Sequence, residues 1–335
     1  MILIYASSLL LSFFLTAKLV PLTIEIGEKY SILDKPNKRK KHKGSLVRIG
    51  GLAIIFSLFT TLIIGLFFLK ISDFEINENI NIFFTLFYFI AFFLIGFADD
   101  IYELSPWLRL FFQIIIASLA FSQGIFLENL DINLLGFQNL NIPINPIFSY
   151  LITIFWLVGV PNAINWMDGL DGLASGITAI SCLAFFLIGF HLNFIIFPLI
   201  AISMIGTLIG FMKYNYFPAK ILMGDGGSNI CGCVLSYLGI LPLSSNFFEI
   251  QNSNSLYIFY YPILILGIPI LDMIVVITSR ILKQNSPFLP DRNHLHHRLL
   301  NNGYSDKKTL KIILFTHFLI CAICSFKIIS GTLIG

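Results

Sequence analysis

Charged residues are scarce in this sequence. They make up 12% of its 335 residues, whereas a soluble domain carries about 25%. Hydrophobic residues amount to 57% and gather into long runs. This composition excludes an ordinary soluble domain and favours a chain that crosses a membrane several times. The net charge of +3 is modest, and we expect no nucleic-acid partner.

Cysteines are few, and none has surroundings that favour chemistry. All five lie in apolar runs, at Cys182, Cys231, Cys233, Cys321 and Cys324. Their close spacing is compatible with metal or redox chemistry, but a thiol in an apolar run lacks the positive neighbours that lower its pKa. We therefore interpret the cysteines as helix-packing residues.

The apolar runs predict an all-α fold. A helix that spans the bilayer needs about 20 mostly apolar residues. The first run has no basic residue before it and no cleavage site, so we interpret it as a retained span. We expect a polytopic membrane bundle of about ten (10–11) transmembrane helices, forming one domain over residues 1–335. The ten candidate spans lie at residues 2–24, 49–69, 82–98, 107–127, 146–162, 172–190, 192–212, 228–244, 256–281 and 310–331.

The basic residues give these spans an orientation. Almost all of the 21 Lys and Arg residues fall in alternate loops, above all in residues 25–48 and 282–309. Basic loops mark the cytoplasmic side, so we expect both termini outside. The polar clusters of the sequence fall in the same set of loops, which predicts one active site on the cytoplasmic face.

Two of these clusters are rich in carboxylates. Asp99 and Asp100 end the third span, and paired carboxylates suit Mg²⁺; a solvated helix end is the alternative. The second cluster follows the fifth span, and its spacing of three predicts one helical face of oxygen-bearing side chains. Its alternative is polar contact between helices. Its members are Asn162, Asn165, Asp168 and Asp171.

Two further clusters are suited to anions. Residues 223–229 contain Asp225 among glycines, and successive backbone amides in a turn or at a helix start bind phosphate; an ordinary turn has the same composition. Residues 290–298 are dense in Arg and His, which favours an anion-binding loop over a zinc site or a solvated basic loop. The basic run 38–42 fits a site, a topology signal or a contact with anionic lipid.

One carboxylate lies inside a span. Asp272 falls in the ninth candidate, and an intramembrane carboxylate is a functional candidate by default; helix pairing is an equal alternative. We interpret His191 and His317, which lie in or beside apolar spans, as structural.

In this order, the clusters resemble those of the polyprenyl-phosphate N-acetylhexosamine-1-phosphate transferases. The resemblance runs from about Asp34 to Arg298. It is carried by residues 34–42, 48–51, 99–100, 162–173, 224–225 with Ser228, and 294–297. The His-Leu-His-His order of the last segment is similar to the N-acetylglucosamine group of that family. Departures at Ser45, Val47, Arg109 and Gly226 leave the sugar open.

The resemblance assigns roles to residues of this sequence. It implies catalytic carboxylates at Asp99, Asp100, Asp168 and Asp171. It implies Mg²⁺, with Mn²⁺ as a substitute, at Asn165 and Asp225. It implies that the histidine loop, with His294, His296 and His297, contacts the donor. With the polar clusters described above, we also expect substrate-binding roles for Lys40, His42, Arg48, Asn162, Lys220, Arg292 and Arg298.

The resemblance also implies a reaction and a place. The family moves a sugar 1-phosphate from a UDP-N-acetylhexosamine, here expected to be UDP-GlcNAc, onto undecaprenyl phosphate and releases UMP. This step starts cell-envelope polysaccharides such as cell wall polymers and lipopolysaccharide O-antigen at the bacterial inner membrane, in a lipid bilayer; a homodimer is one state it allows. A transporter of anionic or lipid-linked substrates and a lipid-binding scaffold are the competing hypotheses. A transporter typically shows repeated halves, which this sequence lacks.

Overall fold

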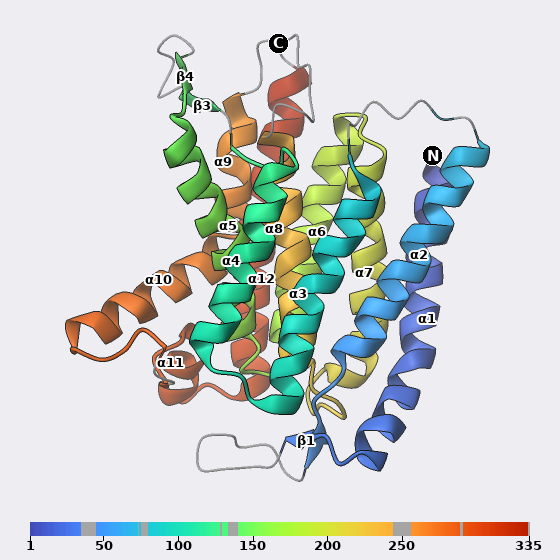
Figure 1. Ribbon diagram of the computed structural model, residues 1–335. Coiled ribbons are helices and arrows are strands. Elements are labelled where there is room, and N and C mark those ends of the chain that lie inside the picture. Colours follow the sequence, from blue (N-terminus) through green and yellow to red (C-terminus); the bar gives the residue numbers. More distant parts are fainter. Residues whose placement is uncertain are drawn as a thin grey trace.

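The computed structural model describes residues 1–34, 45–72, 74, 80–127, 129–132, 140–243, 256–288 and 291–333. Helices dominate it, as predicted (Figure 1). They are α1 (Ile2–Lys29), α2 (Gly51–Ile71), α3 (Ile82–Tyr102), α4 (Pro106–Ser122), α5 (Pro146–Met167), α6 (Leu173–His191), α7 (Ile196–Asn215), α8 (Gly224–Ile240), the 3-10 turn η1 (Leu241–Leu243), α9 (Leu256–Ile265), α10 (Gly267–Leu282), α11 (Leu295–Asn301) and α12 (Asp306–Leu333).

Short strands form two antiparallel pairs. Strand β1 (Leu33–Asp34) pairs with β2 (Leu46–Val47), and β3 (Asn129–Ile132) pairs with β4 (Leu140–Pro143). These hairpins lie at opposite ends of the bundle, β1 at the end that carries α11 and β3 with β4 at the other end (Figure 1).

The chain is a multi-pass helical membrane protein. Within the described residues, eight helices are long and apolar enough to cross a membrane. Helix α4 has 17 residues and rises about 25 Å, which is slightly short of the apolar core. The start of α1 and the end of α12 lie at the same end of the bundle (Figure 1), as the basic loops predicted.

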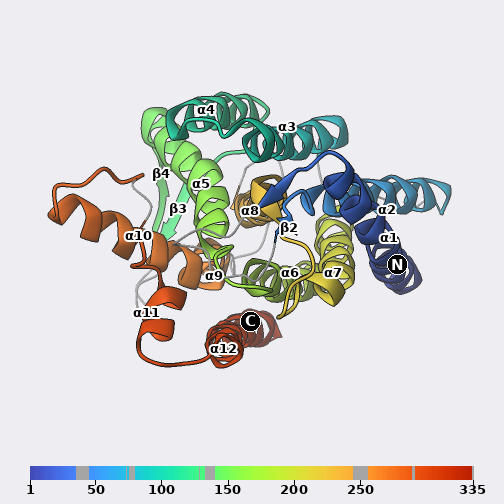
Figure 2. The same cartoon turned by 90° about the horizontal axis from the view of Figure 1, so that it is seen from below.

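Helix α8 forms the centre of the bundle. It is almost entirely buried although its hydropathy is the lowest among the eight candidate spans. Its sequence is rich in Gly, Ser and Cys, and such small residues let neighbouring helices approach closely where no lipid has to be contacted. In the view from below, α3, α5, α6 and α7 surround it (Figure 2).

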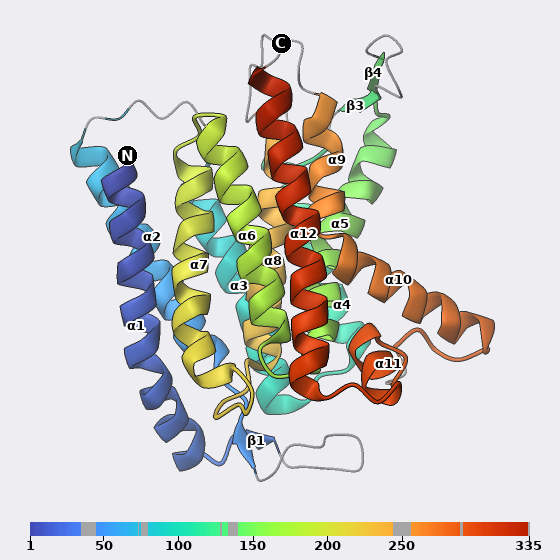
Figure 3. The ribbon, with the colours of Figure 1, turned by 180° about the vertical axis from the view of Figure 1, so that it is seen from behind.

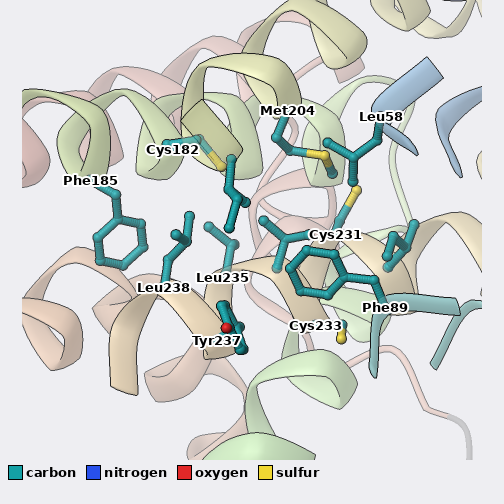
Figure 4. Packing of buried hydrophobic residues seen from close by; sticks show 14 of the residues in the cluster. Leu58, Phe89, Cys182, Phe185, Met204, Cys231, Cys233, Leu235, Tyr237 and Leu238 are labelled. Carbon is teal, nitrogen blue, oxygen red and sulfur yellow. The ribbon is translucent and has the colours of Figure 1, made fainter. Parts of the chain in front are cut away.

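Packing around α8 is dense and apolar. Cys231, Cys233 and Tyr237 of α8 are buried beside side chains of α2, α3, α6 and α7 (Figure 4). The cysteines are free thiols, in agreement with their interpretation as packing residues. Tyr237 also donates or accepts a hydrogen bond with Thr85 of α3 at 2.6 Å, which satisfies its hydroxyl in an apolar setting.

The ninth predicted span is wrong as one continuous helix. The chain turns at Leu266, so α9 and α10 are separate helices, and α10 leaves the bundle at an angle (Figures 1 and 3). Proline explains the break, since Pro262 lies inside α9 and Pro269 lies in the first turn of α10. The N–H groups in the first turn of a helix have no helical acceptor. Proline, which lacks an N–H, therefore loses no helical hydrogen bond at a helix start.

Candidate active site

The centre of the site is the start of α8, which Asp100 caps. The two carboxylate oxygens of Asp100 accept hydrogen bonds from the backbone N–H groups of Asp225 and Gly226, each at 2.9 Å. A carboxylate there is favoured because the first N–H groups of a helix have no helical acceptor and carry partial positive charge. These are two of the amides we expected to contact phosphate. They are instead occupied by Asp100.

Arg48 joins this cap to the other carboxylate of α8. Its Nε donates to Asp100 at 3.1 Å, and its Nη2 donates to Asp225 at 3.3 Å. Burial acts to lower the pKa of Arg48, but the charges of Asp100, Asp225 and Asp34 outweigh it and raise the pKa. Arg48 is therefore a fixed positive charge. Asp34 was part of the resemblance without a role in the predicted site, and the structure places it close enough to act on Arg48.

A short backbone ladder holds Arg48 in place. The N–H of Leu222 donates to Val47 at 2.9 Å, and the N–H of Gly50 donates back to Leu222 at 3.1 Å. The segment before α8 thus runs beside the segment before α2. Gly224 begins α8 with φ +74°, and a Cβ there would lie 1.9 Å from the carbonyl oxygen of Arg48. Only glycine fits this approach.

The carboxylate of Asp99, near the end of α3, lies close to the carboxylate of Asp225. Arg109 of α4 forms an ion pair with Asp99, and the carboxylates of Asp99 and Asp225 lie near enough to interact directly. From α5, the amide nitrogen of Asn165 donates to Asp225 at 2.6 Å and to the hydroxyl of Ser228 at 2.9 Å. The prediction that these distant polar segments meet is therefore confirmed.

The expected stripe of four polar side chains on one helix is wrong. Helix α5 ends at Met167, so Asp168 is its C-cap and Asp171 lies in the following turn. Asp171 accepts a hydrogen bond from the backbone N–H of Ala219 at 2.9 Å. The helix ends early because residues 168–172 contain two glycines, and Gly172 takes φ +76° before α6.

Asn162 lies one turn deeper than the ion pairs. Its amide nitrogen donates to Gln113 of α4 at 2.8 Å, and Gln113 donates to Asn229 of α8 at 3.3 Å. This amide relay connects α4, α5 and α8 inside the bundle. The sequence pattern missed Gln113, although a lone amide in an apolar run is itself a signal.

Asn215 is a second residue that sequence reasoning missed. Its side-chain oxygen accepts from the N–H of Gly172 and from Ser175, both at 3.2 Å, and its nitrogen donates to the carbonyl of Ile221 at 3.0 Å. One buried amide thus ties the turn that carries Asp171 to the segment that leads into α8.

Replacement of Asn215 by alanine is expected to destabilise the protein. The change leaves the N–H of Gly172 and the carbonyl of Ile221 buried without these partners, and each such group costs about 1–3 kcal/mol. Thermal unfolding in detergent measures the effect. Asn301, the exposed last residue of α11, provides the matched control, and Asn301→Ala is expected to unfold at the wild-type temperature. Equal melting temperatures for the two variants would contradict the role given to Asn215.

The histidine loop, which comprises residues 291–298 in the described part of the chain, reaches the same end of the bundle. His294 pairs through Nδ1 with Asp272 of α10 at 2.8 Å, and its ring meets Trp166 of α5 edge-on, with centroids 5.6 Å apart. Asp291 receives two hydrogen bonds from Arg280 of α10, at 3.1 and 3.0 Å. Burial acts to raise the pKa of Asp291, but the bonds from Arg280 and Asn293 outweigh it and hold the pKa at about 2.

His296 is buried beneath this loop. It is 1% exposed, and neither ring nitrogen has a hydrogen-bond partner in the described part of the chain. Burial, together with His297 and His294, lowers the pKa of His296 to about 3, so its ring is neutral. A Cβ on Gly169 would lie 2.4 Å from its Nε2, which shows how closely the turn after α5 covers it. A substrate contact by His296 stays a prediction.

Two of the remaining predicted residues lie outside the part of the chain that the structure describes, and the other four are at least partly exposed. Lys40 and His42 lie outside the described residues. Lys220, Arg292 and Arg298 are exposed and His297 is partly exposed; the structure brings none of them into the ion pairs around Asp225.

The donor set fits a magnesium-type ion. Two carboxylates, of Asp99 and Asp225, approach one another, and a cation between them would relieve their repulsion. Asn165 adds an amide group bonded to Asp225. In the described ranges no three acidic, histidine or cysteine side chains form a ready-made metal cage. Mg²⁺ typically takes one or two carboxylates and completes its shell with phosphate oxygens and water, and the carboxylates of Asp99 and Asp225 are ligands of that kind.

Comparison with known proteins agrees with this geometry. The sequence profile of "Glycosyl transferase family 4" matches residues 82–242, which include the ends of α3 and α5 and the start of α8. A Bacillus subtilis relative is 30% identical over 301 residues, covering 90% of this chain and 78% of that protein; its name is "Probable undecaprenyl-phosphate N-acetylglucosaminyl 1-phosphate transferase".

Two further relatives extend the comparison. The undecaprenyl-phosphate alpha-N-acetylglucosaminyl 1-phosphate transferase of Thermotoga maritima is 30% identical, covering 91% of this chain and 83% of that protein. The decaprenyl-phosphate N-acetylglucosaminephosphotransferase of Mycobacterium leprae is 33% identical over 231 residues, covering 65% of this chain and 58% of that protein. On this similarity, which spans most of its length, the chain belongs to glycosyl transferase family 4.

Proposed function

We propose that the protein transfers N-acetylglucosamine 1-phosphate from UDP-N-acetylglucosamine to undecaprenyl phosphate. The observation that carries the proposal is the linkage of Arg48, Asp100 and Asp225 at the start of α8. It places one fixed positive charge and one partly exposed carboxylate at a helix start, which suits a diphosphate with a bound cation. The relatives' names supply the sugar and the lipid.

The acceptor's hydrocarbon tail requires an apolar surface beside this point. Helices α4, α5 and α10, which carry Arg109, Asn165 and Asp272, expose large hydrophobic side chains, among them Phe111, Phe155 and Leu271. Trp107 at the start of α4 meets Phe288, after α10, edge-on with centroids 4.9 Å apart. The tail would lie along these helices within the bilayer, with its phosphate at the ends of α3 and α8.

The chemistry is an exchange of one diphosphate bond for another. An oxygen of the lipid phosphate attacks the phosphorus that bears the sugar, and the bond from this phosphorus to the bridging oxygen breaks. UMP leaves with the bonding electrons. The lipid phosphate has its second pKa near 6, so it is mostly a dianion at neutral pH and needs no strong base. The protein's contribution is then position and charge.

Named side chains supply that position and charge. Asp99 orients the acceptor phosphate or takes its residual proton, and Arg109 holds Asp99 in place. Arg48 neutralises charge on the diphosphate. Asp225 and Asp99, with Asn165, would hold Mg²⁺ or Mn²⁺, which neutralises the diphosphate and stabilises the departing UMP when bound. Asp168 and Asp171 shape the donor side, and Arg292 and Arg298 attract the donor.

The proposal includes a location. The end of the bundle that carries β1, α11 and the site is the end that the basic loops assign to the cytoplasm. The chain would lie in the bacterial inner membrane and start a cell-envelope polysaccharide there. The oligomeric state is to be measured, and a homodimer is compatible with this proposal.

A transfer assay tests the proposal. Purified protein in detergent receives undecaprenyl phosphate and a panel of radiolabelled UDP-sugars, and lipid-linked label and UMP are followed. We expect transfer from UDP-GlcNAc that stops with EDTA and returns with Mg²⁺. Transfer from another UDP-sugar alone would correct the sugar. No transfer from any donor by folded protein with Mg²⁺ would refute the reaction.

The acceptor chain is tested in the same assay. One relative is named for a decaprenyl and others for an undecaprenyl acceptor, so family membership does not fix the length of the lipid. Parallel reactions with both lipids are expected to favour undecaprenyl phosphate. A preference for the shorter lipid would change the acceptor and leave the reaction class intact.

A further inference from the structure

Asp272 is a buried carboxylate whose two oxygens are both engaged by the histidine loop. It lies on α10 and is 4% exposed. Its Oδ2 is 2.8 Å from Nδ1 of His294, and its Oδ1 accepts from the N–H of Leu295 at 2.7 Å. A buried carboxylate requires such partners. The alternative of simple pairing between spanning helices does not describe these contacts, because both partners lie at the start of α11.

The carboxylate determines which nitrogen of His294 carries a proton. An ionised carboxylate can only accept, so Nδ1 of His294 is the protonated nitrogen. Nε2 then points away from Asp272 as an acceptor in the neutral ring or as a donor in the charged ring. The His294 side chain keeps 10% exposure.

Two aromatic neighbours fix the plane of the ring. Trp166 contacts it edge-on, and His296 stacks nearly parallel to it with centroids 5.8 Å apart. Trp166 follows Asn165 directly in the chain, so the ring of His294 has a fixed relation to the side chain that bonds Asp225. Orientation and tautomer are therefore both set before a ligand arrives.

Anchoring of the loop does not by itself explain Asp272, since a second anchor exists. Arg280 of α10 holds Asp291 through two hydrogen bonds and stacks on Trp166 with its guanidinium 5.0 Å from the ring centroid. This pair fastens the loop to α10 three residues before His294. What Asp272 adds is control of the imidazole itself.

We propose that Asp272 is a positioning residue that holds His294 in the Nδ1-protonated form and aims Nε2 at the diphosphate of the donor. The proposal rests on the proposed function, because the diphosphate is the ligand of that reaction. It adds a carboxylate–histidine pair to the site in place of the helix-pairing role.

A double-mutant cycle tests the proposal. The full chain is prepared as Asp272→Asn, His294→Gln and the double variant, and transfer is measured with the donor and the acceptor varied separately. We expect Asp272→Asn to lower kcat/KM for the donor by about tenfold to a hundredfold, the range for partners that orient a histidine. The KM for the lipid should change by less than about twofold. In the His294→Gln background, Asp272→Asn should cost no more than about twofold, because it acts through His294.

A purely structural role gives a different pattern. It would lower the melting temperature and reduce activity by the same factor with or without His294, and that result would overturn the proposal. Full donor kcat/KM in folded Asp272→Asn would also overturn it. If this variant does not fold, His294→Gln decides, since undiminished donor kcat/KM there removes the role for His294.

Matched controls distinguish a failure of the positioning role of Asp272 from a failure of the proposed function. Ser181 of α6 forms a buried hydrogen bond with His317 of α12 at 2.8 Å, and Ser181→Ala removes a polar partner of a histidine away from the site, so its transfer rate should equal that of the wild type. Absence of transfer by the wild-type protein would refute the proposed function. Wild-type transfer together with an unaffected Asp272→Asn refutes only the positioning role.

Discussion

Replacement of Asp100 by asparagine is expected to lower the transfer rate by about a hundredfold to a thousandfold, the effect typical of removing one preorganised electrostatic group. The Asp100 side chain is 1% exposed, and its two oxygens serve two backbone N–H groups of α8. In asparagine an NH₂ group replaces one oxygen and faces an N–H donor. The negative charge opposite Arg48 is lost as well. Radiolabel transfer and thermal unfolding, measured on the same preparation, report the two effects.

A nearby carboxylate provides the control for this exchange. Glu103 follows α3 directly and is exposed, so Glu103→Gln removes one negative charge at the same helix end without breaking a buried bond. Its transfer rate should stay within about twofold of the wild type. If folded Asp100→Asn transferred as fast as Glu103→Gln, Asp100 would not be the link between Arg48 and α8.

Gly224→Ala is expected to lower the transfer rate as strongly as Asp100→Asn does, but for a steric reason. The added Cβ would lie 1.9 Å from the carbonyl oxygen of Arg48 and 2.7 Å from Oδ2 of Asp100. Backbone atoms on one side and a capped carboxylate on the other leave no room, so the segment before α2 must move away from α8. Arg48 moves with it. We expect a loss of at least about a hundredfold in transfer rate.

Gly303 separates this clash from backbone strain. Its φ is +87°, and a Cβ there would meet nothing within 4 Å. Gly303→Ala therefore carries the strain of a left-handed alanine, about 1–2 kcal/mol, without a collision. We expect a small drop in melting temperature and normal transfer. Transfer at the wild-type rate by Gly224→Ala would show that the two segments approach less closely than described.

The sequence predicted that the site residues would come together, because this depends only on which loops lie on the same side of the membrane. Basic residues in alternate loops assign every second loop to one side of the membrane. Asp99, Asn165 and Asp225 end or begin spans on that side, so they must lie at one surface whatever the packing. These expectations use only the order of elements along the chain.

Pairings between side chains could not be predicted in the same way. Nothing in the sequence says that Asp100 caps α8, because the cap depends on where α3 crosses α8. The role of Asp272 depends on the turn at Leu266, which moves α10 out of line with α9. Pro262 and Pro269 do mark that turn, but the mostly apolar segment 256–281 has 26 residues, which is long enough for one continuous span. These contacts depend on how closely the helices pack, and the order of the helices along the chain does not determine that.

The small residues of α8 have a consequence for how the protein enters the membrane. Helix α8 is the least hydropathic candidate span, so it is the weakest signal for insertion by itself. The helices that contact α8 most extensively, α2, α3, α5 and α6, all precede it in the chain. During synthesis the helices that enclose α8 are therefore already in the bilayer when it emerges. The order of the chain therefore places the helices that pack against α8 in the membrane before α8, which carries Asp225.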